Sequence, residues 1–220
     1  MIRGTRAKTA LVIFGLLAVI PAGDGAALSA TPHVLRYHVK HSTYGDIGTY
    51  SNTIEETGDV TTVLTEAHFK VRLLGITLYH EDAERTERWS GARLVYFHGV
   101  TTKDGQSLEL SGETRGDDFV ITSPHGSVTA PGDVHPANPW SANFLDASTM
   151  MRVDIGAIEP VHVSGGEASS VTIDGATLPV RAYEIDGKTR YRIWLSEADQ
   201  VPVMFSVDDD SGKVTFTLAR

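Results

Sequence analysis

The stretch His68-Phe-Lys-Val-Arg-Leu-Leu-Gly-Ile-Thr-Leu-Tyr-His80 decides the fold of this chain. In its first half, apolar and charged residues alternate, which is typical of a β-strand with one buried face. Gly75 interrupts the apolar run and predicts a turn. A charged run follows to Arg88, and Ser90-Gly91 predicts a second turn before the apolar residues 94–97. Residues 68–100 therefore predict three antiparallel strands at the centre of a long meander.

Residues 81–88 fit two different structures. The run Glu-Asp-Ala-Glu-Arg-Thr-Glu-Arg consists largely of residues that also form helices. We favour a strand, because a helix between the two turns would leave the sheet with no continuation. Both faces of this strand would be polar, so we expect it to be an exposed edge or a solvated ridge.

Turn signals recur about every ten residues along the rest of the chain, which is typical of an all-β domain. Asp-Gly pairs at 104–105, 174–175 and 186–187 accept the positive φ angles of tight hairpins. The pattern changes between residues 123 and 151, where Asn138-Pro139 has the composition of a helix start. Trp140, Phe144, Ala147 and Met151 then fall on one helical face. We predict a curved antiparallel β-sheet with one short covering helix near residues 139–147.

The N-terminus has the three-part pattern of a secretory signal peptide. Three basic residues within the first eight positions precede an apolar run over residues 10–20, and small residues follow it. The apolar run is too short for a membrane-spanning helix, so we favour a signal peptide over an uncleaved anchor. We expect cleavage after Ala27 or Ala30 and a single domain over residues 31–220. The mature protein would then be periplasmic or secreted, without a membrane span.

Charge narrows the range of partners. The full chain carries 19 Lys and Arg against 28 Asp and Glu, a net charge of −9. Residues 1–30 hold three of the basic residues and one acidic residue, so the mature chain keeps 16 against 27, a net charge of −11. Such a surface repels nucleic acids and anionic lipid headgroups, and we expect neither as a partner. The chain has no Cys, so its core must be stable without disulfides.

No residue pattern supports a metal site, a cofactor or catalysis. His125 and His135 do not have a zinc spacing, and His80-Glu81 lacks the second His of a zinc-protease motif. The chain has no Gly-x-Ser-x-Gly motif and no nucleophilic Cys. We predict no catalytic residue, no metal and no cofactor. A hydrolase with two carboxylates far apart in sequence leaves no local pattern, so this alternative stays open.

Several residue patterns resemble a known family. The pattern Phe69-x-Val71-x-x-Leu74-Gly75-Ile76-x-x-Tyr79, followed by Glu87-x-Trp89 and Arg93-Leu94-Val95, resembles a family of uncharacterised secreted bacterial proteins. The ending, with Trp194-Leu195-Ser196, Pro202-Val203 and a last hairpin, is similar to related periplasmic proteins. The resemblance covers most of residues 34–219. It implies the half-barrel fold of the lipoprotein-carrier superfamily, a curved sheet that cups a lid helix. It transfers no catalytic or binding residue.

The predicted helix face carries the functional hypothesis. Trp140, Phe144 and Met151 would either fill the core beneath the sheet or form a mobile lid over an apolar groove. Core packing is the simpler interpretation. The carrier-like fold supports the second one, in which the groove holds a lipid or another hydrophobic small molecule and these three residues contact it. A structural or protein-interaction module of the cell envelope, without a ligand, is the alternative. The sequence leaves the oligomeric state open.

Overall fold

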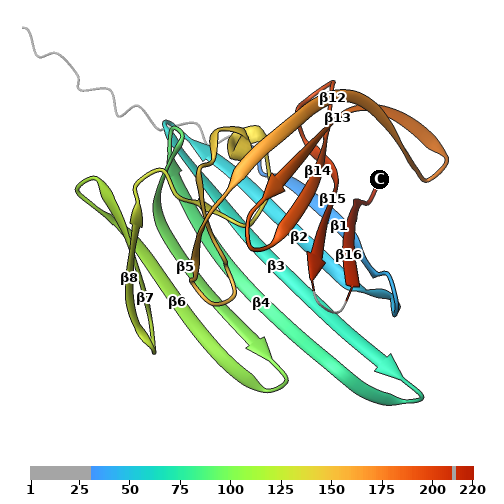
Figure 1. Ribbon diagram of the computed structural model, residues 1–220, viewed down its shortest axis with the longest axis horizontal. Coiled ribbons are helices and arrows are strands. Elements are labelled where there is room, and N and C mark those ends of the chain that lie inside the picture. Colours follow the sequence, from blue (N-terminus) through green and yellow to red (C-terminus); the bar gives the residue numbers. More distant parts are fainter. Residues whose placement is uncertain (1–30, 210–211) are drawn as a thin grey trace, which may run out of the picture.

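Figure 1 shows the computed structural model of the protein, which describes residues 31–209 and 212–220. The predicted signal peptide lies outside the described residues. The strands are β1 (His33–His41), β2 (Gly45–Thr57), β3 (Val60–Leu73), β4 (Ile76–Ser90), β5 (Arg93–Lys103), β6 (Gln106–Arg115), β7 (Asp118–Ser123), β8 (Gly126–Pro131), β9 (His135–Pro136), β10 (Thr149–Met151), β11 (Ile158–Pro160), β12 (His162–Ile173), β13 (Ala176–Asp186), β14 (Arg190–Ser196), β15 (Pro202–Asp209) and β16 (Gly212–Leu218). The predicted all-β class is confirmed.

Thirteen of these strands form one antiparallel sheet, in the order β12-β13-β14-β15-β16-β1-β2-β3-β4-β5-β6-β7-β8. Neighbouring strands are also neighbours in sequence except where β1 pairs with β16, with Tyr37 opposite Leu218. The sheet stays open, because β8 and β12 are its two edges. The residues between these edges, 132–161, form an inserted segment with its own small sheet, β11-β10-β9.

The sheet is strongly curved, and strands β12–β16 lie across strands β1–β5 in Figure 1. Register shifts interrupt several strand pairs, for example between Val71 and Arg72 of β3 and between Arg88 and Trp89 of β4. Such bulges bend a strand and increase its local twist. At Gly48, which has a φ of 142°, an added Cβ would lie 1.9 Å from the carbonyl oxygen of His68. Only glycine permits this close approach of β2 to β3.

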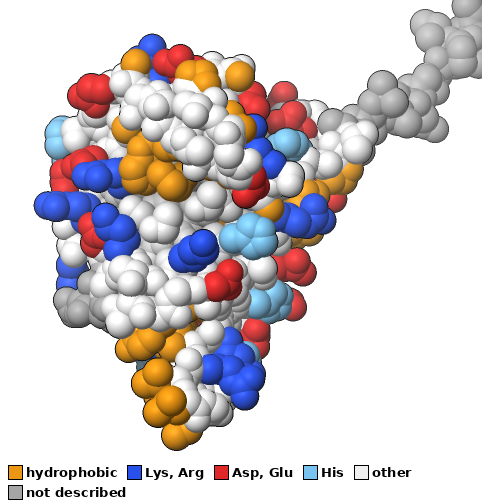
Figure 2. Space-filling view, turned by 90° about the vertical axis from the view of Figure 1, so that its right-hand side faces the viewer, with side chains coloured by type: hydrophobic (Ala, Val, Ile, Leu, Met, Phe, Trp, Pro, Cys, Tyr) orange, Lys and Arg blue, Asp and Glu red, His pale blue; other side chains and the backbone are white. Residues whose placement is uncertain are grey.

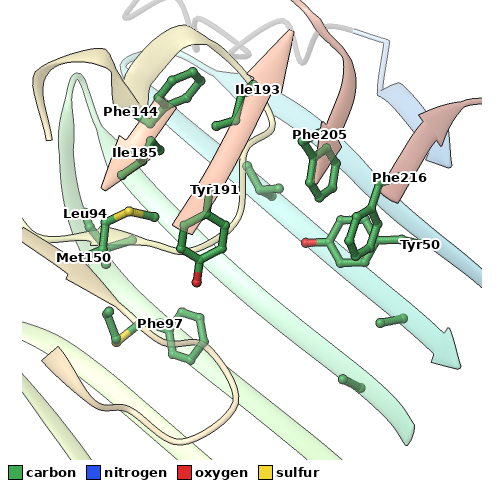
Figure 3. Close-up of a cluster of buried hydrophobic side chains, with 14 of the residues drawn as sticks. Tyr50, Leu94, Phe97, Phe144, Met150, Ile185, Tyr191, Ile193, Phe205 and Phe216 are labelled. Atoms are coloured by element: carbon green, nitrogen blue, oxygen red, sulfur yellow. The ribbon is translucent and has the colours of Figure 1, made fainter. Parts of the chain in front are cut away.

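The core lies on the concave face, where both ends of the chain and the inserted segment meet (Figure 3). In β1, buried Leu35, Tyr37 and Val39 alternate with exposed residues, as expected for a strand with one solvated face. Figure 3 places Tyr50 of β2 beside Phe205 and Phe216 of the last two strands. The rings of Phe205 and Phe216 are stacked, with centroids 4.2 Å apart. Each fully buried side chain of this size contributes about 1.5–3 kcal/mol to folding.

The three strands predicted over residues 68–100 are confirmed as β3, β4 and β5, with turns at Gly75 and Gly91. Residues 81–88 are part of β4, so the choice of strand over helix is also confirmed. The prediction that this strand is an exposed edge is wrong, because β4 pairs with β3 on one side and β5 on the other. Its alternate residues Ala83, Arg85, Glu87 and Trp89 are buried. Two charged residues therefore face the core.

The covering helix is shorter than predicted. The inserted segment contains only the 3₁₀ helix η1 (Ala142–Asp146), capped by Ser141, whose Oγ accepts a hydrogen bond from the backbone N of Asn143 at 3.2 Å. Ala147 is extended and ends the turn, and Met151 belongs to β10. The helical face from Trp140 to Met151 is thus not formed, because β10 pairs with β9 and β11 instead. None of the helical structure in the described residues is long and apolar enough to cross a bilayer.

Candidate functional site

A cleft of about 890 Å³ lies between the middle strands of the sheet and the inserted segment. This volume falls within the range of roughly 300–1,000 Å³ that is usual for small-molecule sites. Three parts of the chain line it: strands β1–β5, the inserted segment around Pro139 and Val153, and strands β14–β16 with the turn before them. Residues more than 100 positions apart in sequence therefore form one site.

The cleft has apolar walls interrupted by polar groups. Phe69 and Val71 of β3 line it together with Val207 and Val214. These two valines are opposite each other on β15 and β16. The stacked rings of Phe205 and Phe216 also line the cleft. A surface of this composition favours hydrocarbon over water.

Charged side chains surround the cleft. The ammonium group of Lys103 lies 4.9 Å from the ring centroid of Tyr79, whose hydroxyl donates a short hydrogen bond to Glu81. Arg152 pairs with Asp154 at 2.6 Å. Lys103 and Lys188 both line the cleft, and neither forms an ion pair within residues 31–209 and 212–220. The cleft thus has cationic groups available for an anion.

Arg85 places a buried guanidinium group in the wall of the cleft. Its Nη2 donates to Thr101 Oγ1 at 3.2 Å and lies 3.8 Å from Glu81 Oε1. Its Nε is buried without a hydrogen-bond partner in the part of the chain that the structure describes. A guanidinium group has five N–H donors, and leaving one unpaired away from water costs free energy. Because Glu81 also lines the cleft and pairs with Arg85, the charge of this guanidinium group is already opposed within the protein.

One side chain of the inserted segment attaches it to the sheet beside the cleft. The Oδ1 atom of Asn138 accepts hydrogen bonds from Tyr50 Oη at 2.6 Å and Asn52 Nδ2 at 3.1 Å. Its Nδ2 donates to Glu87 Oε1 at 2.7 Å and Thr65 Oγ1 at 3.1 Å. All four hydrogen-bonding positions of this amide are thus occupied. We call Asn138 and these four partners the buried polar network.

Glu87 is the charged member of the buried polar network, and it is fully buried. Its Oε2 accepts from Trp89 Nε1 at 2.9 Å and Trp140 Nε1 at 3.3 Å. Burial raises the pKa of Glu87 to about 7, although the hydrogen bonds from Asn138, Trp89 and Trp140 oppose this rise. The carboxyl group faces protein donors and does not line the cleft. Its position fits a structural role.

The three predicted ligand-binding residues all lie outside the lining of the cleft. Trp140 is half-buried, with its ring 6.0 Å from that of Trp89. Phe144 is buried and meets the ring of Tyr183 edge-on at 6.1 Å, and Met151 is fully buried. The structure thus places Phe144 and Met151 in the core. The role of these three residues in ligand binding stays a prediction.

Sequence reasoning missed Arg85, Glu87 and Asn138, which define the interior beside the cleft. A signal was present, because Ala83, Arg85, Glu87 and Trp89 alternate along one face of β4 and two of them are apolar. Asn138 was interpreted as a helix cap and is instead buried in the polar network. Among the described residues, no group of three or more His, Asp or Glu side chains has an arrangement that could hold a metal ion.

Comparison with known proteins places the chain in a family. Residues 43–219 match the family described as Domain of unknown function (DUF6134), and the chain belongs to this family. The prediction of an uncharacterised family is thereby confirmed, and the resemblance to the lipoprotein-carrier superfamily stays a prediction. A search of curated proteins found no match.

Proposed function

We propose that this member of a family of unknown function binds an amphipathic molecule, an acyl chain with an acidic end group, in the cleft. The observation that carries the proposal is the combination of apolar walls with cationic groups that lack an anionic partner. Phe69, Val207 and Phe216 would contact the chain, and Lys103 or Lys188 would pair with the acidic group. A fatty acid is the simplest molecule with this chemistry.

The physical chemistry of the walls favours such a ligand. Each methylene group transferred from water to an apolar wall contributes about 0.8 kcal/mol. About fifteen buried methylene groups would contribute about 12 kcal/mol, enough to offset about 4 kcal/mol of entropy lost on association and leave micromolar affinity. The acidic group would form a charge-assisted hydrogen bond with Lys103 or Lys188, which form no ion pair within the described residues. The N-terminal signal-peptide pattern supports the cell envelope or the exterior as the place of action.

Filling the cleft tests the proposal directly. Val207 is half-buried in the cleft wall, so Val207→Trp would occupy the volume that the acyl chain needs. With cis-parinaric acid, a fluorescent fatty acid, we expect saturable binding to the wild-type protein and at least about tenfold weaker binding to Val207→Trp. Val128→Trp, at an exposed position of β8, is the matched control and should bind as the wild type does. Urea denaturation of each variant would establish that it is folded.

The competing function is a structural or protein-interaction module with no ligand. The attachment of the inserted segment through Asn138 favours it, because a fixed segment closes part of the concave face permanently. This alternative predicts no saturable binding of the fatty acid to the wild type, or equal binding to Val207→Trp. Either result would refute the lipid-binding proposal. Mass spectrometry of an organic extract of the purified protein adds an independent measurement of a bound lipid.

A further inference from the structure

The tip of the β3–β4 hairpin exposes a cluster of large aliphatic side chains. Leu73, Leu74, Ile76 and Leu78 are all about half or more exposed, and Leu74 is 95% exposed. Figure 1 shows that this hairpin extends beyond the neighbouring strands, and Figure 2 shows hydrophobic side chains at the lower end of the molecule beside Lys and Arg side chains. We call residues 72–78 the hairpin tip. Single exposed aliphatic residues are ordinary, but a cluster at a protruding tip indicates a contact surface.

Turn geometry does not require these aliphatic residues. Leu74 and Gly75 form a two-residue turn in which both φ angles are positive, 51° and 85°. Asp104-Gly105 and Asp174-Gly175 form turns with nearly the same angles, 49° and 83°, and 50° and 81°. Asp or Asn is preferred at the first position of this turn, whereas a bulky residue there is strained. Leucine at position 74 is therefore unfavourable in two ways: it strains the turn, and it exposes aliphatic surface to water. A contact with another molecule is the physical explanation that remains.

The charges around the hairpin tip are basic, unlike those of the whole chain. Arg72 is exposed and forms no ion pair within the described parts of the chain. Lys70 is exposed further from the turn, opposite His80, where it also interacts with Asp82. Residues 67–80 contain no Asp or Glu, in a chain with 28 acidic residues. The nearest acidic side chains along the hairpin are Glu81 and Asp104. Both lie at the level of His80 or further from the turn. By strand geometry this is about 13 Å from the turn. That distance exceeds the Debye length of about 8 Å at physiological ionic strength, so the tip acts as a basic surface despite the negative net charge.

We propose that the hairpin tip docks on an anionic lipid bilayer, with Leu73, Leu74 and Ile76 entering the interfacial region and Arg72 contacting acidic headgroups. Two neighbouring strands are only about 5 Å apart, so the tip is too narrow to supply the roughly 800 Å² that one partner of a stable protein interface buries. A bilayer needs no shape complementarity, and an apolar tip with the basic Arg72 beside it matches its layered structure.

The position of the hairpin tip relative to the cleft supports this occupant over a protein. Leu78 belongs to the tip and also lines the cleft, and Val71 and Tyr79 beside it do so too. A bilayer in contact with the tip would therefore adjoin the opening of the cleft. Docking itself does not depend on a ligand in the cleft, so it can be tested separately from lipid binding.

Flotation with lipid vesicles tests the proposal. We expect the wild-type protein to float with vesicles of phosphatidylcholine mixed with phosphatidylglycerol, and less with phosphatidylcholine alone. Leu74→Asp should weaken the partition at least about tenfold. Arg72→Glu should lower the ratio of flotation with anionic vesicles to flotation with phosphatidylcholine alone by several-fold. Leu64→Asp is the matched control, because Leu64 is also exposed on β3 but lies far from the tip, and it should float as the wild type does.

Three results would overturn the proposal: no flotation of the wild type with either vesicle, equal flotation of Leu74→Asp and the wild type, or an equal loss in Leu64→Asp. All variants share one N-terminus, so any contribution of residues 1–30 cancels in the comparison. Light scattering without vesicles adds one further outcome. A wild-type dimer that Leu74→Asp dissociates would identify the hairpin tip as a protein interface and would also overturn bilayer docking. Binding of cis-parinaric acid by Leu74→Asp should be unchanged, which separates docking from the cleft.

Discussion

The two ends of the β3–β4 hairpin differ in the kind of side chain that they bury and expose. Toward its base, β4 buries the charged residues Arg85 and Glu87, whereas at its tip Leu73, Leu74 and Ile76 face solvent. Both arrangements are unfavourable by themselves, because burying a charge costs free energy and exposing aliphatic surface forfeits the hydrophobic stabilisation. The base compensates within the chain through hydrogen bonds from Asn138, Trp89 and Trp140 to Glu87. The tip has no such compensation within the described chain, so the comparison assigns a structural role to the base and an external contact to the tip.

The largest expected effect is at the base, in Asn138→Ala. This change removes the shared partner of Tyr50, Asn52 and Glu87 and leaves their polar groups unpaired in the core. Each unpaired buried group costs about 1–3 kcal/mol, so we expect the free energy of unfolding to fall by about 4 kcal/mol in urea denaturation.

Asn143→Ala is the control for this prediction. Asn143 lies in the same inserted segment and is half-buried, and its backbone hydrogen-bonds with Ser141 Oγ and with His135, contacts that alanine keeps. We expect its loss of stability to stay below about 1 kcal/mol. Equal losses in the two variants would contradict a structural role for the buried polar network.

The pH dependence of stability should show the buried charge at the base. The unfolded chain releases the proton of Glu87 near its ordinary pKa of 4.5, whereas the folded protein keeps it up to about pH 7. Between these values the folded state binds more protons, so the free energy of unfolding should fall as the pH rises, by on the order of 3 kcal/mol. Glu87→Gln has no proton to release and should lack this part of the slope. Urea denaturation of both proteins between pH 4.5 and 7 measures the difference, and parallel curves would contradict the raised pKa of Glu87.

The sequence predicted the strands better than it predicted the buried polar groups. Period-two alternation and Asp-Gly turns depend on neighbouring residues, so they predicted the all-β class and the three strands within residues 68–100. They did not predict β10, because Met151 was placed on a helix face. The place of β4 in the sheet depends on its pairing with β3 and β5, which the local sequence does not show. The charged residues of 81–88 alone suggested that this strand is an edge. Asn138 was misassigned for the same reason, because its partners Tyr50 and Glu87 are 88 and 51 residues away in sequence.

The cleft was not predictable residue by residue from the sequence. Phe69 and Phe216, which both line it, come from opposite ends of the chain and are brought together by the curvature of the sheet. That curvature arises from bulges such as the one at Val71, which have no signal in a single sequence. The exposed tip could have been found, because Leu73-Leu74-Gly75-Ile76 places aliphatic residues around a turn where polar residues are usual.

The smallest expected effect is at the tip and has the opposite sign. Leu74→Asn places a residue that tolerates positive φ at the first position of the turn and removes an aliphatic side chain from water. We expect the free energy of unfolding to rise by about 0.5 kcal/mol, with an unchanged denaturant slope in urea. Asp174→Leu makes the reverse change in the β12–β13 turn, which has nearly the same φ angles, and should lower stability by a similar amount. A loss of stability in Leu74→Asn would mean that Leu74 supports the fold, and the contrast between base and tip would then fail. A gain would establish that the protein retains Leu74 at the expense of its own stability, as expected for a residue that serves an external contact.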